Sequence, residues 1–320
     1  MQKETMTKLK TFKNGYCDAI YCALSGVLKV DENVIEYAEN NLSDEEIQVL
    51  CDYSALLNKI AGVGEVNLKV PRVRKGINAL EKYGLSGYEI LDANYANGLN
   101  ASDLLGGRLM LEINNLQEHN GGSLAEISDF CGLTQMPILI HFGRDLESVG
   151  KIVNKFSLSP ASLLEEYGFL DRQCYLYGMN YIDKDDQILL ANYSPTLILA
   201  PKSDGYQGKG GINLYNLIYN RLKFVFSSGN CYNIDMLKEG LIALLNTNNL
   251  MNSSSLVDRS EILSALCQEK GNEIEIDCQE ENILEKQFVS KDETLWAQMR
   301  CLKEKIKEIA NKLKEKTNGN

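Results

Sequence analysis

Short apolar runs that alternate with helical segments constrain this chain more than any other feature of its sequence. The runs lie near residues 15–22, 65–70, 87–93, 108–113, 137–142, 174–179, 196–201 and 223–228, and helical spacing of apolar residues follows them. Strands that are apolar throughout need cover on both faces, which is typical of a parallel sheet flanked by helices. Eight such units close a barrel, so we predict an α/β fold, a (β/α)8 TIM-type barrel with extra C-terminal helices.

The first helix after the initial run has a clear start signal. The segment from Ser43 opens with the pattern S-x-x-E and keeps apolar residues at helical spacing as far as Gly62. In this capping box, the serine side chain and the glutamate three residues later each bind a backbone N–H of the first turn. We therefore expect a helix that begins at Ser43.

The C-terminal part departs from the repeat. We expect a loop in the Asn/Ser-rich segment 246–255, then a helix over 257–271. Residues 272–277 alternate like a strand, which is either an added edge strand or the remnant of a small accessory sheet. This divides the chain into an N-terminal extension (1–14), the barrel (15–270), a strand and linker (271–290) and a terminal helix (291–320).

The terminal helix carries a heptad seam. Apolar residues follow one another at spacings of four and three, and they are Leu295, Met299, Leu302, Ile306, Ile309 and Leu313. Since a single helix draws its stability from packing, we expect this seam to dock on the chain's own barrel or, as the alternative, on a partner helix or a second copy.

Charge and composition exclude several classes of function. The net charge of −11 repels phosphate and anionic lipid, which argues against nucleic-acid and membrane-surface binding. The sequence has neither an apolar run of membrane-spanning length nor the apolar segment of a signal peptide. Nine cysteines without a C-x-x-C pair suggest buried thiols in a reducing compartment, so we expect a cytoplasmic location.

The strands and their connections resemble the metal-dependent amidohydrolases, in the branch of cytosine, guanine and S-adenosylhomocysteine deaminases and triazine chlorohydrolases. The resemblance spans residues 14–245 and runs without gaps over 174–230. There the family has a strand that ends in Cys-Pro and then Ser-Asn and Gly-Ser-Gly turns. Pro201, Ser203, Asp204 and the segment 208–210 stand at those positions.

The resemblance implies a divalent metal, zinc or iron in active relatives, that activates a water molecule. Most residues that would serve this chemistry are replaced here. Ile20 and Cys22 stand where strand one carries His-x-His, and His141 matches the next ligand. Three residues later, Arg144 stands where the family has the glutamate that transfers protons. A guanidinium does not deprotonate in proteins, so it cannot take over this role. Further along, Gly178 and Tyr181 stand at the next histidine positions, and Ser228, Gly229 and Asn230 replace Thr-Asp-Gly.

Coordinated replacement predicts an amidohydrolase-like pseudoenzyme that has lost hydrolysis and serves in binding, scaffolding or regulation. We expect no cofactor; a three-ligand site of His141, Cys22 and Asp18 is the alternative. Arg144 favours a small anionic ligand at the barrel mouth, where we expect the binding residues to be His141, Arg144, Tyr181, Ser203 and Asp204. Bulky Phe142, Tyr177 and Tyr181 filling this mouth would favour a scaffold instead.

Two possibilities for the activity of the chain stay open at this point. The chain is either this pseudoenzyme or an active hydrolase on carbon–nitrogen bonds with an unorthodox or metal-free site around His141 and Arg144, in which Asp204, Tyr181 or Tyr206 transfers protons.

Relatives carry a β-sandwich around the barrel, but few residues precede the first strand here, so we expect the sandwich to be missing or reduced. The bared surface favours a homo-oligomer or pairing with an active amidohydrolase.

Overall fold

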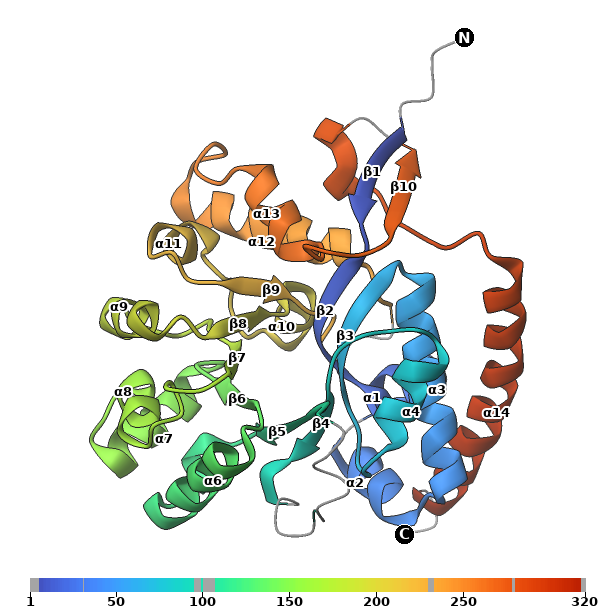
Figure 1. Ribbon diagram of the computed structural model, residues 1–320, viewed down its shortest axis with the longest axis horizontal. Helices are drawn as coiled ribbons and strands as arrows, with labels where there is room; N and C mark the ends of the chain where they lie inside the picture. Colours follow the sequence, from blue (N-terminus) through green and yellow to red (C-terminus); the bar gives the residue numbers. More distant parts are fainter. Residues whose placement is uncertain are drawn as a thin grey trace. The chain divides into compact units, whose positions relative to one another are not determined.

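Eight strands form one sheet in chain order, and their described pairings are parallel (Figure 1). The computed structural model describes residues 6–30, 32–94, 99, 107–229, 233–277 and 280–317. The strands are β2 (Phe12–Asp18), β3 (Val63–Lys69), β4 (Glu89–Asp92), β5 (Leu109–Ile113), β6 (Ile138–Phe142), β7 (Cys174–Gly178), β8 (Thr196–Leu199) and β9 (Phe224–Phe226). Strand order and the intervening helices confirm the predicted (β/α)8 class.

The chain forms two compact units. The first contains the described residues of Met1–Glu89, Ser227–Lys238 and Leu266–Asn320, and the second contains those of Ile90–Phe226 and Glu239–Ala265. Helices of the first unit are α1 (Ala19–Leu24), α2 (Glu32–Asn41), α3 (Asp44–Ile60), α4 (Lys75–Lys82) and α14 (Glu293–Thr317), with the 3-10 helix η3 (Glu280–Glu285).

The second unit carries the remaining helices. They are η2 (Leu116–Glu118), α6 (Gly121–Thr134), α7 (Leu146–Phe156), α8 (Pro160–Glu166), α9 (Lys184–Tyr193), α10 (Pro201–Gln207), α11 (Leu214–Tyr219) and most of α12 (Met236–Met251) and α13 (Arg259–Leu266). Figure 1 shows α6, α7, α8 and α9 on the outer side of β5 to β8. Nearly all residues of these four strands are buried, which explains their continuous apolar sequences.

In the first unit, the segment after β9 pairs with β2. Cys17 and Gly229 form a parallel bridge, and Ser227 Oγ donates a hydrogen bond to the Tyr16 carbonyl at 2.6 Å. The buried Asn14 side chain donates to Ser228 Oγ at 2.8 Å and accepts from the Ser228 N–H at 3.0 Å. These contacts hold the segment 227–229 against the first strand.

Local signals account for the start of α3. Ser43 Oγ accepts from the Glu46 N–H at 3.2 Å, and Glu46 Oε2 accepts from the Ser43 N–H at 2.7 Å. The predicted capping box is confirmed. It satisfies two N–H groups that the first turn of a helix otherwise leaves without a partner.

Two predicted elements are wrong. The first strand was expected over 15–22, but β2 ends at Asp18, whose carboxylate accepts from the Tyr21 N–H and caps α1. The apolar sequence continues across this cap, so composition alone does not reveal where the strand ends. The predicted loop over 246–255 is helical as far as Met251, because buried Thr247 hydrogen-bonds to Leu214 and Ile212 and holds the last turns of α12.

The heptad seam docks within its own unit. Helix α14 packs mainly on α3 and also contacts α1 and α2, burying the seam from Met299 to Leu313 (Figure 1). Lys312 Nζ lies 2.7 Å from Glu46 Oε1 at the rim of this contact. The first of the two expected arrangements is therefore the one observed.

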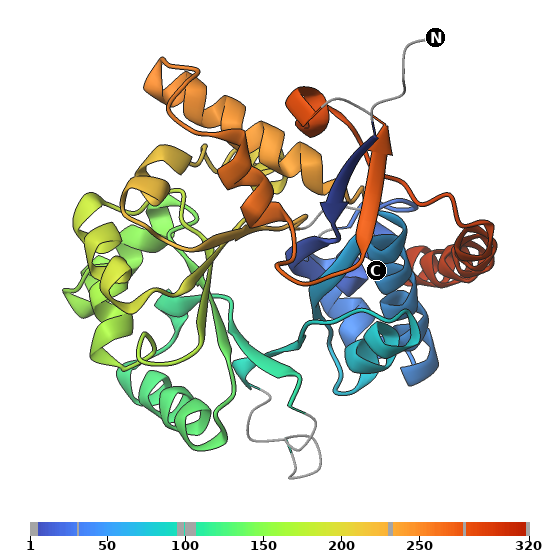
Figure 2. The ribbon, with the colours of Figure 1, turned by 45° about the horizontal axis from the view of Figure 1, so that its top comes forward.

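The strand-like segment 272–277 is the remnant of an accessory sheet. It forms β10 (Glu273–Asp277), which pairs antiparallel with β1 (Met6–Lys10) in a two-stranded sheet (Figure 2). Of the two expected arrangements, the one observed is a small sheet separate from the eight-stranded one.

The remaining general expectations concern thiols and membranes. Seven cysteines fall in the described part and none forms a disulfide there; five are buried, Cys267 is half-buried and Cys301 is exposed. Cys231 and Cys278 lie outside the described residues. Among the helices that the structure describes, none combines the length and the hydropathy needed to cross a bilayer.

Candidate functional site at the strand ends of the second unit

A buried carboxylate and an imidazole meet at the carboxyl ends of β5 and β6. Glu112 is fully buried, and its Oε1 lies 2.8 Å from His141 Nε2. The other ring nitrogen, Nδ1, lies 3.2 Å from Nη1 of Arg144. Because a guanidinium only donates, Nδ1 must accept and the ring proton must be on Nε2, directed at Glu112. Glu112, His141 and Arg144 therefore form one hydrogen-bonded chain.

Arg144 is held on several sides. Its side chain is 15% exposed, and Cζ lies 4.9 Å from the centre of the Tyr177 ring. Nη2 donates to Gln207 Oε1 at 3.4 Å and lies 4.0 Å from Asp204 Oδ1. A partly desolvated cation over an aromatic face is stabilised by about 1–2 kcal/mol, so Tyr177 adds to the ionic contacts.

Gly178 makes room for this arginine. At this position φ is +121°, and a Cβ atom would lie 2.2 Å from Arg144 Cγ and 2.8 Å from the Phe142 carbonyl oxygen. Real Cβ contacts are not that short, so a residue with a side chain would have to displace the arginine. The two replacements identified in the sequence, Arg144 and Gly178, are thus sterically matched.

The other predicted binding residues take different places. Asp204 lies in α10 close to Arg144, and Ser203 reaches the site through Gln207, whose Nε2 donates to Ser203 Oγ at 3.1 Å. Tyr181 is half-buried and packs against Gly210, where an added Cβ would lie 2.9 Å from its hydroxyl. The structure brings His141, Arg144 and Asp204 together, with Ser203 one contact further away.

A buried donor remains available at this site. Within the described residues, Arg144 Nε is buried and makes no hydrogen bond, while the Asn180 side-chain amide faces the Asp204 carboxylate. Burial raises the pKa of Asp204, against the opposing effects of the neighbouring Asn180 amide and the charges of Arg144 and Lys209. A buried donor such as Arg144 Nε fits a small polar ligand or water, since buried polar groups are otherwise paired.

The remaining predicted positions lie in the first unit. Ile20 and Cys22 are buried in α1 rather than at a strand end, and Asp18 caps that helix. Gly229 lies in the bridge to Cys17 with φ +53°, and Asn230 is outside the described residues. These side chains serve packing, capping and strand pairing.

The donors around His141 do not match a zinc site. Both ring nitrogens are engaged within the protein, and the adjacent group is a cation. Over the described part of the chain, no group of three or more His, Cys, Asp or Glu residues is placed to hold a metal ion, the set of His141, Cys22 and Asp18 included. Zinc held through His141 would have to displace Arg144 or Glu112.

Comparisons with known proteins place this site in context. No family model matches the sequence. A 5-methylthioadenosine/S-adenosylhomocysteine deaminase from Caldicellulosiruptor saccharolyticus is 26% identical over 129 residues, which cover 39% of this chain and 30% of that protein. The match therefore spans less than a third of the curated relative.

Solved structures match over much more of the chain. An adenosine deaminase from Xanthomonas campestris with bound zinc superimposes with a TM-score of 0.76 at 11% identity, covering 95% of this chain and 86% of that one. This chain has an amidohydrolase-like fold. An atrazine chlorohydrolase from Arthrobacter aurescens, complexed with zinc and atraton, gives 0.65 at 12% identity over 81% and 69% of the two chains. The resemblance seen in the sequence is confirmed.

These structures correct one prediction about the amidohydrolase-like chain. We expected no cofactor for this chain, and the zinc in both of these neighbours contradicts that expectation. It rested on counting replaced ligands in a single sequence, which does not reveal what the surrounding fold can recruit.

Sequence reasoning missed Glu112, Asn180 and Gln207. Glu112 had a usable signal, because it is the only charged residue within the run 109–113, and a glutamate in a buried strand is rarely left unpaired. Asn180 and Gln207 had none, since each is an ordinary polar residue next to a turn or helix end.

Proposed function

We propose that this amidohydrolase-like chain binds a small anionic ligand at the site around Arg144 and has lost the deaminase-type hydrolysis for which its relatives are named. In this role it is a binding, scaffold or regulatory pseudoenzyme. The observation that carries the proposal is the matched pair of Arg144 and Gly178: a permanent cation occupies the position of the family's proton-transferring glutamate, in space left by a missing side chain.

A guanidinium cannot take a proton from water or return one to a leaving amine. Glu112 is a carboxylate at this site, but it is fully buried and already accepts from His141. A general base must reach the proton that it removes, and this carboxylate faces the imidazole instead.

The same geometry supports ligand binding. Arg144 Nε is a buried donor without a hydrogen bond in the described residues, and it suits an anionic oxygen. Asp204 opposes this when it is ionised, because its carboxylate lies 4.0 Å from Arg144 Nη2. We infer a ligand that pairs with Arg144 and is favoured when Asp204 is protonated.

Two broader assignments belong to this proposal. We infer a homo-oligomer or a complex with an active amidohydrolase, because a protein without turnover acts through what it binds. A cytoplasmic location fits the free thiols of the described cysteines.

The alternative is an active hydrolase on carbon–nitrogen bonds. The Glu112–His141 contact favours it, since a carboxylate that orients an imidazole is a recurrent part of acid–base catalysis. Arg144 argues against a hydrolase, because its Nη1 donates to Nδ1 of His141, the ring nitrogen that would have to accept a proton.

Ammonia release separates the two. The purified chain, with and without added zinc, is incubated with adenosine, guanine and S-adenosylhomocysteine, and a known adenosine deaminase serves as positive control. We expect no release above the uncatalysed rate. Release that disappears in His141→Ala would overturn the proposal and establish the hydrolase.

Ligand binding is tested by calorimetric titration with benzoate and, as a neutral control of the same shape, benzamide. We expect benzoate to bind the wild type and not Arg144→Gln, with no binding of benzamide. Equal binding of benzoate by wild type and variant would refute the assigned site.

A further inference from the structure

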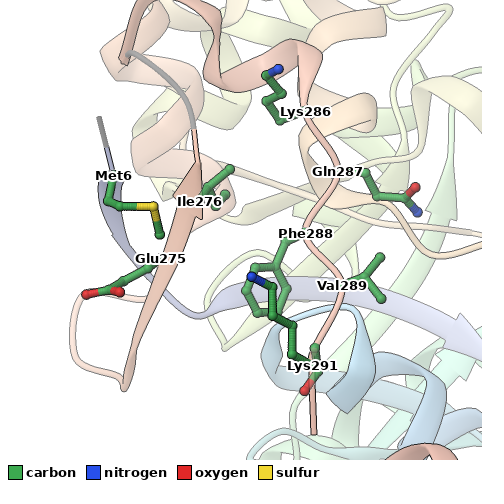
Figure 3. Close-up of a pocket in the computed structure, with 9 residues that line it drawn as sticks. Met6, Glu275, Ile276, Lys286, Gln287, Phe288, Val289 and Lys291 are labelled. Atoms are coloured by element: carbon green, nitrogen blue, oxygen red, sulfur yellow. The ribbon is translucent and has the colours of Figure 1, made fainter. Parts of the chain in front are cut away.

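A groove lies beside the two-stranded sheet of the first unit (Figure 3). It has a volume of about 450 Å3 and is lined by Met6, Glu275, Ile276 and the segment 286–291. Figure 3 places β10 on one side of the groove and the chain from Lys286 to Lys291 on the other. Both walls are within the same compact unit.

Among the residues that the structure describes, β10 pairs on one side with β1 and has no strand on its other edge. The Thr11 N–H donates to the Asn272 carbonyl at 2.9 Å, next to the register pair Lys10–Glu273. Antiparallel pairs alternate between hydrogen-bonded and non-hydrogen-bonded, so the backbone N–H and C=O of Glu275 point away from β1. In the described part of the chain, no backbone hydrogen bond joins β10 to residues 286–291.

The groove offers apolar contacts as well as backbone groups. Met6 and Val289 are 44% and 42% exposed, although both are large apolar residues. The Phe288 ring packs on Gly62, where an added Cβ would lie 2.5 Å from it, and this contact fixes the far wall. A two-stranded sheet is marginal by itself, and a third strand would both extend it and cover these side chains.

Charge selects the kind of strand. Lys286 and Lys291 line the groove, and neither forms an ion pair with any described residue. The carboxylate of Glu275 is already compensated, because its Oε1 lies 3.4 Å from Lys8 Nζ. The groove thus presents two uncompensated positive charges on a chain whose net charge is −11. A short acidic segment is attracted to these two lysines locally.

We propose that this groove binds an extended acidic peptide segment of a partner protein, which adds as a strand to the free edge of β10 opposite Phe288 and Val289. Main-chain hydrogen bonds to Glu275 supply affinity, and acidic side chains facing Lys286 and Lys291 supply specificity.

The test uses the full chain and a fluorescein-labelled peptide in which valine and glutamate alternate over about eight residues. Two control peptides carry lysine in place of glutamate or a central proline that prevents strand pairing. Fluorescence anisotropy should detect binding of the acidic peptide only. Equal binding of the basic or the proline peptide would overturn the proposal, and so would no binding of any peptide.

Two variants locate the contact. Glu275→Pro removes the outward N–H at a position that makes no ladder bond, while Glu275→Ala keeps it. We expect binding at least about tenfold weaker in the first and within about twofold of wild type in the second. Lys286→Glu/Lys291→Glu should weaken binding about tenfold, whereas Lys303→Glu/Lys305→Glu on α14 should not.

Unchanged binding by both groove variants would refute the site. Sedimentation without peptide checks the other occupant: a wild-type dimer that Lys286→Glu/Lys291→Glu dissociates would assign the groove to a second copy and overturn the peptide proposal.

Discussion

Gly178 leaves the space that the aliphatic part of Arg144 fills: a Cβ atom on the glycine would lie 2.2 Å from Cγ of the arginine. In the family that this chain resembles, the two positions hold a histidine and a glutamate. Replacing only the glutamate by arginine would create a clash, and replacing only the histidine by glycine would leave a hole. The two changes form a new packing unit that places a cation at the strand ends.

Substitution of Gly178 tests this steric match. Gly178→Ala should lower the free energy of unfolding by about 2–4 kcal/mol, because it adds a clash to an unfavourable positive φ. Gly208→Ala, at φ +65° with nothing within 4 Å of the added atom, is the control and should cost about 1 kcal/mol. Chemical denaturation measures both. If Arg144→Ala does not reduce the cost of Gly178→Ala, the two residues are not coupled.

Arg144 also controls access to His141. Removing its guanidinium frees Nδ1 and removes a repulsive charge, so Arg144→Ala should bind zinc at least about tenfold more tightly than wild type. Isothermal titration with zinc measures this difference, and Arg144→Ala/His141→Ala shows how much of it depends on the imidazole. A zinc affinity that is the same in wild type and Arg144→Ala would contradict the assigned contact.

The sequence predicted the order of the strands and helices well, because apolar runs and capping residues are local signals. It failed where tertiary contacts decide. Asp18 ends β2 by capping α1 within an apolar run, and buried Thr247 keeps an asparagine-rich segment helical. Glu112 was missed because its partner, His141, is on the neighbouring strand and close only in the fold. The space between Gly178 and Arg144 is likewise a property of three-dimensional packing.

Anion binding should depend on pH through Asp204. Burial raises the pKa of this carboxyl, so its charge is lost as the pH falls through a value above the usual range near 3.9. The neutral form no longer competes for Arg144, and benzoate should bind about three- to tenfold more tightly at the lower pH. Asp204→Asn should bind tightly at both pH values. A wild-type affinity that falls with decreasing pH, while benzoate stays ionised, would contradict this role.

Asp204 should also make the stability of the protein depend on pH. The direction of this dependence is opposite to that of a salt-bridged carboxylate. Since its pKa is raised in the folded protein, folding favours the protonated form. Its contribution to stability is present below the unfolded pKa and is lost as the pH rises through the folded value. The midpoint of urea unfolding should therefore change less with pH in this window for Asp204→Asn than for wild type.

Docking of α14 contributes to the stability of the first unit. Ile306→Ala removes a buried seam residue and should cost about 2–5 kcal/mol of unfolding free energy. Lys312→Ala removes only the exposed ion pair with Glu46 and should cost less than about 1 kcal/mol. Equal, small costs for both variants would mean that the seam is not packed in solution.

The most direct test of the account is the protonation state of His141. The chain has two histidines, so the imidazole region of a spectrum from protein labelled with 15N-histidine contains two rings, and His119→Gln assigns them. We predict that His141 is neutral with its proton on Nε2 at neutral pH, and that Arg144→Ala or Glu112→Gln changes this signature while leaving His119 unaffected. A proton on Nδ1, or a ring that is insensitive to both substitutions, would contradict the chain of Glu112, His141 and Arg144 on which the proposed function rests.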